Sequence, residues 1–197
     1  MNEKPEFKEF PKMARLSREV IITEKIDGTN ACICITEDGQ FLTGSRSRWI
    51  TPEDDNFGFA RWANENKGKL LALGVGTHFG EWWGSGIQRG YGLAKGEKRF
   101  SLFNTSRWVK KSGECVPPIG EKQEYCPDCC HVVPIMMICP QFESMEIRAC
   151  LENLRTFGSK AAPVFMKPEG VVVFHTAALV GFKKTIEKDD MPKSLAK

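Results

Sequence analysis

The sequence predicts a single domain of the α+β class in which short strands outnumber helices. Its 197 residues are enough for one large domain with a sizeable core. Short runs of β-branched and aromatic residues recur along the chain, and Gly, Pro or Asn bounds them. Two longer stretches carry the apolar spacing of a helix instead. No segment repeats, so we expect one mixed, β-rich domain with a few helices.

The first strands flank an unusual group of charges. The stretch Val20–Ile35 reads VIITEKIDGTNACICI, with Glu24, Lys25 and Asp27 between two apolar runs. A buried strand pair normally carries no charge at such a place. An Asp-Gly pair after the second run is a strong hairpin signal, and we expect the next run, FLTGSRSR, to return as its partner strand.

Local patterns place the remaining elements. A helix is expected over residues 54–69, with a cap at Asp55 or Asn56, and a second over residues 144–158. One face of the second helix carries four apolar residues, and a glycine ends it: Ile147, Cys150, Leu151, Leu154 and Gly158. Further strands are predicted at 75–84, 99–104, 131–138, 169–175 and 178–185, the last two as a hairpin. Residues at about 111–131 are rich in Pro, Gly and Cys and indicate a surface excursion.

Composition argues against a membrane protein and permits a nucleic-acid partner. No apolar run approaches the ~20 residues of a transmembrane helix, and the amino terminus lacks the apolar core of a signal peptide. We therefore expect a soluble, cytoplasmic protein whose cysteines are reduced thiols, with metal binding open to some of them. The net charge of +3 permits a polyanionic partner if the lysines and arginines cluster on one face.

Lys25 fits two interpretations. A lysine at the end of an apolar strand often reaches water and discourages edge-to-edge aggregation. A lysine in an electropositive or partly desolvated pocket loses its proton more easily and becomes an amine nucleophile. Position alone does not decide, but the string EKIDG contains the Lys-x-Asp-Gly signature of covalent nucleotidyltransferases.

Further motifs of that superfamily follow in order between residues 23 and 190: TEKIDGTN, GSRSR, FGEWWG, RFSLFN, PEGVVVF and GFKKTIEKDD. The chain resembles the ATP-dependent RNA ligase family. The resemblance implies a ligase adenylation domain over residues 1–197, with two antiparallel sheets and flanking helices around an ATP cleft. Ligases of this superfamily usually carry a second domain, and few residues follow the last motif here. We therefore expect no separate C-terminal domain, and slower strand sealing than self-adenylation.

The resemblance also implies roles for single residues. Lys25 would attack the α-phosphorus of ATP and form lysyl-AMP, from which AMP passes to a 5′-phosphate before strand joining. Arg46 matches an arginine near phosphate and ribose, and Arg48 is a second candidate that would share its strand face and contact nucleic acid. Glu81 matches a carboxylate that accepts hydrogen bonds from ribose, and the tryptophan pair beside it is expected in the core.

The base and the joining step have their own candidates. Phe103 matches the aromatic residue that stacks on the purine, although Phe100 carries the same side chain three residues earlier. Glu24 is expected to face the adenine, and Asn30 corresponds to an asparagine used in nucleic-acid joining.

Three residues near the end of the chain would act on the phosphates. Glu169 is expected to bind Mg²⁺, a cation that prefers oxygen ligands. Lys183 and Lys184 lie on opposite faces of one strand, so only one shares the pocket of Lys25. We favour Lys183, although relatives have two lysines separated by one residue and Thr185 stands at the second position here.

The cysteines suggest a second site. Cys126 and Cys129 have the spacing of a zinc knuckle, and with Cys115 they form a candidate structural zinc site. Free thiols are an equal alternative. Other residues that would complete four ligands are Cys130, His131 and Cys139. Core packing is expected for Cys32, Cys34 and Cys150.

Three functions remain open at this stage. The first is an RNA ligase that uses ATP and Mg²⁺ on nucleic acid with 5′-phosphate and 3′-hydroxyl ends, RNA being favoured, in RNA repair and with a partner protein as a clamp. The second is a related nucleotidyltransferase that uses GTP or NAD or a non-nucleic-acid acceptor. The third is a nucleic-acid-binding module without catalysis, against which the joint retention of Lys25, Glu169 and Lys183 argues.

Overall fold

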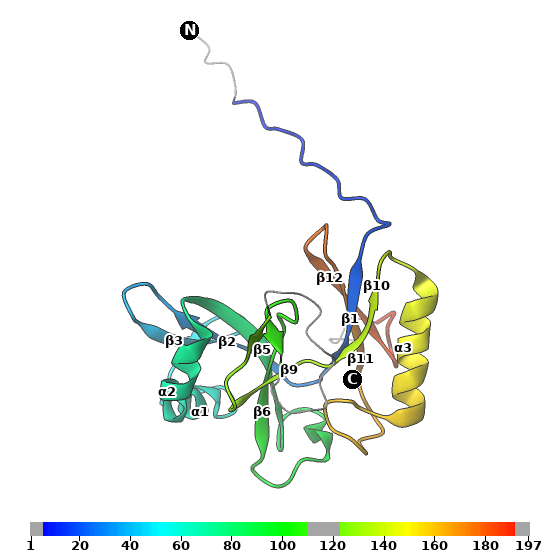
Figure 1. Ribbon diagram of the computed structural model, residues 1–197. Coiled ribbons are helices and arrows are strands. Elements are labelled where there is room, and N and C mark those ends of the chain that lie inside the picture. Colours follow the sequence, from blue (N-terminus) through cyan, green and yellow to red (C-terminus); the bar gives the residue numbers. More distant parts are fainter. Residues whose placement is uncertain (1–5, 110–122, 192–197) are drawn as a thin grey trace.

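Two β-sheets lie beside each other, and helices flank them on the outside (Figure 1). The computed structural model describes residues 6–109 and 123–191 of the chain. Both sheets are antiparallel apart from one parallel pairing at the edge of the larger sheet. The predicted α+β class is confirmed.

The larger sheet has six strands in the order β4-β3-β2-β5-β6-β9. Their bounds are Trp49–Ile50 for β4, Phe41–Ser45 for β3, Thr29–Ile35 for β2, Gly76–Gly84 for β5, Lys98–Leu102 for β6 and Cys130–Val132 for β9. The hairpin of β2 and β3 forms as predicted, with Gly39 at φ 84°, where a residue with a side chain is disfavoured.

The smaller sheet has four strands in the order β10-β1-β11-β12. They are β10 (Ile135–Cys139), β1 (Val20–Lys25), β11 (Gly170–His175) and β12 (Val180–Thr185). The predicted hairpin of β11 and β12 is present. Because β1 lies in the middle, the start of the domain pairs with its last third, and Lys25 is placed opposite Gly170.

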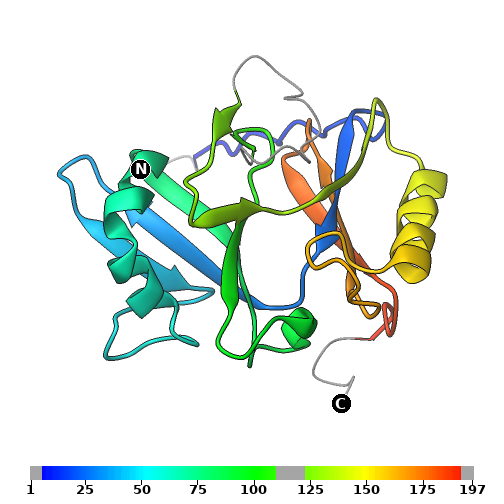
Figure 2. The same ribbon diagram turned by 60° about the horizontal axis from the view of Figure 1, so that its bottom comes forward.

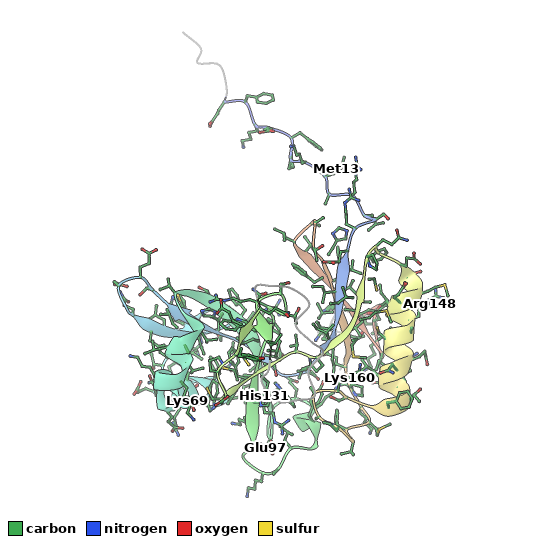
Figure 3. All side chains as sticks on the ribbon, viewed as in Figure 1. Met13, Lys69, Glu97, His131, Arg148 and Lys160 are labelled. Atoms are coloured by element: carbon green, nitrogen blue, oxygen red, sulfur yellow. The ribbon has the colours of Figure 1, made fainter. Side chains whose placement is uncertain are left out.

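Three α-helices and two 3₁₀ turns complete the chain that the structure describes: α1 (Phe59–Glu65), α2 (Lys67–Leu70), η1 (Leu71–Leu73), η2 (Gly90–Gly92) and α3 (Ser144–Phe157). The predicted apolar face of α3 is buried and packs on the smaller sheet, while Arg148 lies on the outer side of the helix (Figure 3). At the start of α1 the carboxylate of Asp55 accepts hydrogen bonds from the N–H groups of Ala60 (2.8 Å) and Arg61 (3.0 Å). Asp55 therefore caps the first turn from outside, whereas the N-cap position is Gly58 and the helix begins later than the predicted residue 54.

Two connections cross between the sheets, the blue segment that follows β1 and the yellow-green segment between β9 and β10 (Figure 2). The second corrects a prediction, since residues 131–138 were expected to form a single strand. Pro134 has no N–H and fixes its φ, so the strand is interrupted there. The residues before it pair with β6, and those after it pair with β1.

A small apolar cluster fills the space where the sheets meet. It contains Ile26, Trp83, Tyr91, Val133 and Ala162. Trp82 belongs to the core of the larger sheet, so both tryptophans are buried as expected. Cys32 and Cys150 are also buried, whereas Cys34 is only half-buried.

The ends of the described chain lie outside this core. Residues before β1 form an arm that runs away from the body, on which Met13 is 83% exposed (Figure 3). The surface excursion is only partly described: its short strand β8 (Glu124–Tyr125) pairs with β7 (Trp108–Val109), and residues 110–122 lie outside the described chain. No helix in the described residues is long and apolar enough to cross a membrane.

Candidate active site

Lys25 lies at the joint between the two sheets. It ends β1, and the chain then enters β2 of the larger sheet through Ile26–Gly28. A Cβ at Gly28 would lie 2.4 Å from the carbonyl oxygen of Trp82, so only glycine allows this close passage. The apolar run of β1 thus ends where the chain must turn away from its sheet, and a charged residue is accommodated there.

The amino group of Lys25 forms an ion pair with the carboxylate of Glu169, 144 residues later in the chain. The side chains are 19% and 4% exposed, respectively, so water only partly screens the pair. The pairing of β1 with β11 brings them together, since Lys25 lies opposite Gly170. A Cβ at Gly170 would lie 2.2 Å from the carbonyl oxygen of Lys184, so close strand packing requires glycine here too.

Glu81 reaches the same place from β5. Its Oε1 accepts a hydrogen bond from the N–H of Gly28, and its Oε2 accepts one from Nδ2 of Asn30, both at 3.0 Å. Burial raises the pKa of Glu81 from 4.5 to about 7. The positive charge of Lys25 and the two hydrogen bonds oppose this rise, and the negative charge of Glu169 adds to it.

Glu24 turns a carboxylate inward beside the nucleophile candidate. Its Oε2 accepts hydrogen bonds from the N–H groups of Lys160 (2.8 Å) and Ala161 (2.9 Å). Its Oε1 is buried. Burial raises the pKa of this carboxyl group. Hydrogen bonds from the Ser159 side chain and from the two backbone N–H groups oppose this rise.

A cavity of about 750 Å³ lies between the two sheets, and Glu169, the partner of Lys25, is not among the described residues that line it. Of the predicted residues, Glu24, Lys25, Asn30, Glu81 and Phe103 line it. The volume is in the range of small-molecule sites, and a few polar groups converge within largely apolar walls. The arrangement suits a ligand with a flat apolar part and a phosphate or hydroxyl part.

The cavity distinguishes the two phenylalanines that the sequence left alike. Phe100 is fully buried in the core of the larger sheet, whereas Phe103 follows β6 and is 40% exposed on the cavity. Val172 and Phe174 of β11 also line the cavity, from the smaller sheet. Of Phe100 and Phe103, only Phe103 is therefore placed to contact a planar ligand, and Phe79 of β5 also lines the cavity.

The register of β11 and β12 separates the two lysines. Lys183 is opposite Val172, which lines the cavity, so both side chains lie on the same face of the sheet. Lys183 itself is not among the described residues that line the cavity. Lys184 is opposite Val171, which packs in the core with α3, and its Nζ lies 2.7 Å from the Asp189 carboxylate.

Comparison with known proteins assigns the family. The family model described as RNA ligase matches residues 18–188. The chain belongs to the RNA ligase family. A comparison with curated proteins gives no match.

Solved structures of Naegleria gruberi RNA ligase share the fold of this RNA ligase family member. A lysine-to-alanine mutant with ATP and Mn is 16% identical, with a TM-score of 0.51 over 86% of this chain and 50% of that one. An aspartate-to-alanine mutant without ligand is 19% identical, with a TM-score of 0.53 over 85% of this chain and 49% of that one. The complex with PPi is 17% identical, with a TM-score of 0.51 over 86% of this chain and 50% of that one. The chain thus spans about half the length of these structures.

The structure corrects one expectation about the two arginines of this RNA ligase family member. Arg46 and Arg48 do not share a strand face, because β3 ends at Ser45 and the chain turns, with the N–H of Ser45 donating to the carbonyl of Arg48 at 2.8 Å. The guanidinium of Arg48 pairs with the carboxylate of Asp54. Neither arginine is among the described residues that line the cavity.

The zinc site stays a prediction. Cys126 is buried and its Sγ lies 3.7 Å from the carbonyl oxygen of Cys130, while Cys129 packs against the same core. Cys115 lies outside the described residues. Within the described part, no group of three or more His, Cys, Asp or Glu side chains is arranged to hold a metal.

Sequence reasoning missed one end of the cavity. His78, Thr105 and Arg107 line it there, although no motif includes Thr105 or Arg107. His78 donates from Nε2 to the carbonyl oxygen of Gly74 at 2.9 Å, and burial lowers its pKa, which favours the neutral ring. Alternation along β5 gave no signal for them, because residues 77, 79 and 81 share one face of that strand while His78 lies on the other. Thr105 and Arg107 follow β6 in a turn, outside any strand pattern.

Proposed function

We propose that this protein is an ATP-dependent RNA ligase that forms lysyl-AMP on Lys25, transfers AMP to a 5′-phosphate and joins that end to a 3′-hydroxyl. The observation that carries the proposal is the ion pair of Lys25 with the buried Glu169, because Lys25 lines a cavity that Glu81 and Glu24 also line. A lysine used only for solubility would not be held against a carboxylate within a cavity.

The first step follows from the contact between Lys25 and Glu169. The neutral amine attacks the α-phosphorus of ATP, a nitrogen–phosphorus bond forms, and the phosphorus–oxygen bond to pyrophosphate breaks. The amine must lose a proton to water for this, and the Glu169 carboxylate paired with it orients the nitrogen. The result is AMP held on nitrogen as a phosphoramidate, ready for transfer to a 5′-phosphate.

Glu24 supports adenine over guanine. The Glu24 side chain lines the cavity, and its carboxylate would accept a hydrogen bond from the exocyclic amino group of adenine, which is a donor. Guanine presents a carbonyl oxygen at the same ring position, which would leave two acceptors facing each other. Structures of Naegleria gruberi RNA ligase have been solved with ATP and with AMP, in agreement with this choice.

The rest of the nucleotide matches two further cavity residues. Phe103 offers an exposed ring for stacking on the base, an interaction worth about 1–3 kcal/mol in nucleic-acid complexes. Glu81 accepts hydrogen bonds with both of its carboxylate oxygens, and each oxygen has a second lone pair for a ribose hydroxyl. Asn30 donates a hydrogen bond to Glu81, so in this proposal Asn30 supports nucleotide binding as well as the joining step.

The phosphate end fits a divalent cation. Glu169 and Glu81 place two carboxylates beside Lys25, and Mg²⁺ is usually held by one or two carboxylates together with substrate phosphates. When bound, Mg²⁺ would supply positive charge to the phosphate oxygens. Lys183, on the cavity face of β12, would add a fixed charge of its own, as would Arg46 if the loop after β3 reaches the phosphates.

Labelling with ATP tests the proposal. Protein given ATP labelled at the α-phosphate and Mg²⁺ should carry label in an acid-labile, base-stable bond. Lys25→Ala should carry none, whereas the matched control Lys69→Ala, an exposed lysine on α2 (Figure 3), should label as the wild type does. Labelling that survives in Lys25→Ala, or labelling from GTP or NAD in place of ATP, would contradict the proposal.

Strand joining needs a separate assay. We propose that residues 1–197 act as one adenylation domain. Holding the nucleic acid in line is worth up to ~7–11 kcal/mol in well-oriented reactions. Nicked and single-stranded RNA, DNA and hybrid substrates should be compared at low and physiological salt. Sealing of a pre-adenylated RNA nick should be slow and salt-sensitive relative to self-adenylation, unless a clamp protein is added. Fast sealing that does not change with salt would contradict the proposal that this domain adenylates itself faster than it seals strands.

A further inference from the structure

Arg89 connects two segments of the active site without lining its cavity. It lies between β5 and β6, directly before η2. Its Nε donates to Oδ2 of Asp27 at 3.2 Å. Its Nη1 donates to the carbonyl oxygens of Lys167 at 2.9 Å and Pro168 at 3.4 Å.

Both segments carry a reacting group. Asp27 lies two residues after Lys25, and Pro168 directly precedes Glu169. The Lys25 amine and the Glu169 carboxylate are paired, so the guanidinium of Arg89 holds the backbone next to each partner of that pair. Among the described residues that line the cavity, Arg89 does not appear. It is thus placed to act through Lys25 and Glu169 and not on a nucleotide.

The chemistry of these contacts requires arginine. The guanidinium is planar and points several N–H donors in fixed, divergent directions, so one group serves a carboxylate and two carbonyl oxygens. The compact ammonium group of a lysine in this place would not span the same three acceptors. The Arg89 side chain is 31% exposed and the Asp27 side chain 12%, so the pair is partly shielded from water.

We propose that Arg89 is a positioning residue for self-adenylation, which holds the Asp27 and Lys167–Pro168 segments so that Lys25 and Glu169 stay within reach of each other. The inference rests on the proposed function. Misplacement of a nucleophile lowers the rate of the chemical step, and it leaves nucleotide contacts made by other residues in place. Loss of Arg89 should therefore lower kcat for lysyl-AMP formation with little change in KM for ATP.

Arg99 is a matched control. It also comes from the larger sheet and reaches the loop after α3, where its Nη1 donates to the carbonyl oxygen of Ala161 at 3.4 Å. Its side chain is 29% exposed, it pairs with Glu97, and it packs over the ring of Trp83. Within the described chain, the hydrogen bonds of Arg99 go to Glu97 and Ala161 and not to Asp27 or to residues 167–169, so its removal tests the general loss of a bridge between the sheets.

The experiment compares Arg89→Ala, Arg89→Lys and Arg99→Ala in AMP loading over a range of ATP concentrations, with thermal unfolding measured for each variant. We expect Arg89→Ala to lower the maximal rate at least about tenfold while KM stays within about twofold. Arg89→Lys should not restore the rate, and guanidinium chloride at millimolar concentration should restore part of it in Arg89→Ala. Arg99→Ala should load AMP within about twofold of the wild type.

Each outcome decides between the two proposals. If the wild type takes up no AMP, the proposed function fails. The positioning role fails if the wild type loads AMP and Arg89→Ala does so equally fast. It also fails if Arg99→Ala is as slow as Arg89→Ala, or if the loss of rate follows the loss of folded protein. A raised KM with an unchanged kcat would place Arg89 in nucleotide binding instead.

Discussion

The buried carboxyl group of Glu81 makes the stability of the protein depend on pH, and Glu81→Gln should remove that dependence. Burial raises the pKa of Glu81 to about 7 in the folded chain, against 4.5 for an ordinary glutamate. The folded state therefore keeps a proton that the unfolded state releases between these two values. The stabilisation is fully present below about pH 4.5 and is lost as the pH rises through about 7.

The size of the effect follows from the two pKa values. They differ by roughly 2.5, and each unit corresponds to about 1.4 kcal/mol, so the wild type should lose about 3 kcal/mol of unfolding free energy that Glu81→Gln does not lose. Glutamine stays neutral at every pH. Glutamine replaces one carboxylate oxygen by an NH₂ group, so one of the two N–H donors of Gly28 and Asn30 loses its acceptor. The free-energy cost of that lost hydrogen bond is the same at each pH.

Urea unfolding at pH 5, 6, 7 and 8, followed by tryptophan fluorescence, measures this prediction. The difference in unfolding free energy between Glu81→Gln and the wild type should shift in favour of the variant by about 2.5 kcal/mol between pH 5 and pH 8, because part of the full effect falls below pH 5. A difference that stays constant with pH would refute the argument from burial.

Three further predictions concern stability and metal. Leu154→Ala opens a cavity under the smaller sheet and should cost about 2–5 kcal/mol, whereas Phe157→Ala on the exposed side of α3 should change stability by less than about 0.5 kcal/mol. Asp55→Ala removes the cap of α1 and should cost about 1 kcal/mol in thermal or urea unfolding. Protein purified without chelator should hold about one zinc per chain on Cys115, Cys126 and Cys129, and metal analysis showing less than about a tenth of that would favour unbound thiols.

Local pattern was sufficient for the elements whose signal lies within a few residues. The apolar face of α3 repeats at helical spacing and ends at a glycine, and the structure buries the four residues that this spacing selects. The hairpin of β2 and β3 follows from one Asp-Gly turn. The motif order also indicated the RNA ligase family, which the match over residues 18–188 shows.

Pattern failed where neighbouring residues belong to different sheets. The run at 131–138 has continuous β-forming character, and its division at Pro134 depends on which strands lie on either side. The expectation for Arg46 and Arg48 assumed that the strand continued, but β3 ends one residue before Arg46. Arg89 carried no signal at all, because its partners are 62 and 78 residues away in the chain.

The sequence by itself determined the fold class, the family and the residue types that could perform nucleotidyl transfer. Only the tertiary structure decided which of them meet: Glu169 with Lys25, Phe103 and not Phe100 at the cavity, and Lys183 on the cavity face of β12. The physical reason is that periodicity reports the side of an element on which a residue lies. Strand order and register, which join residues 144 positions apart, are fixed by the packing of the whole chain.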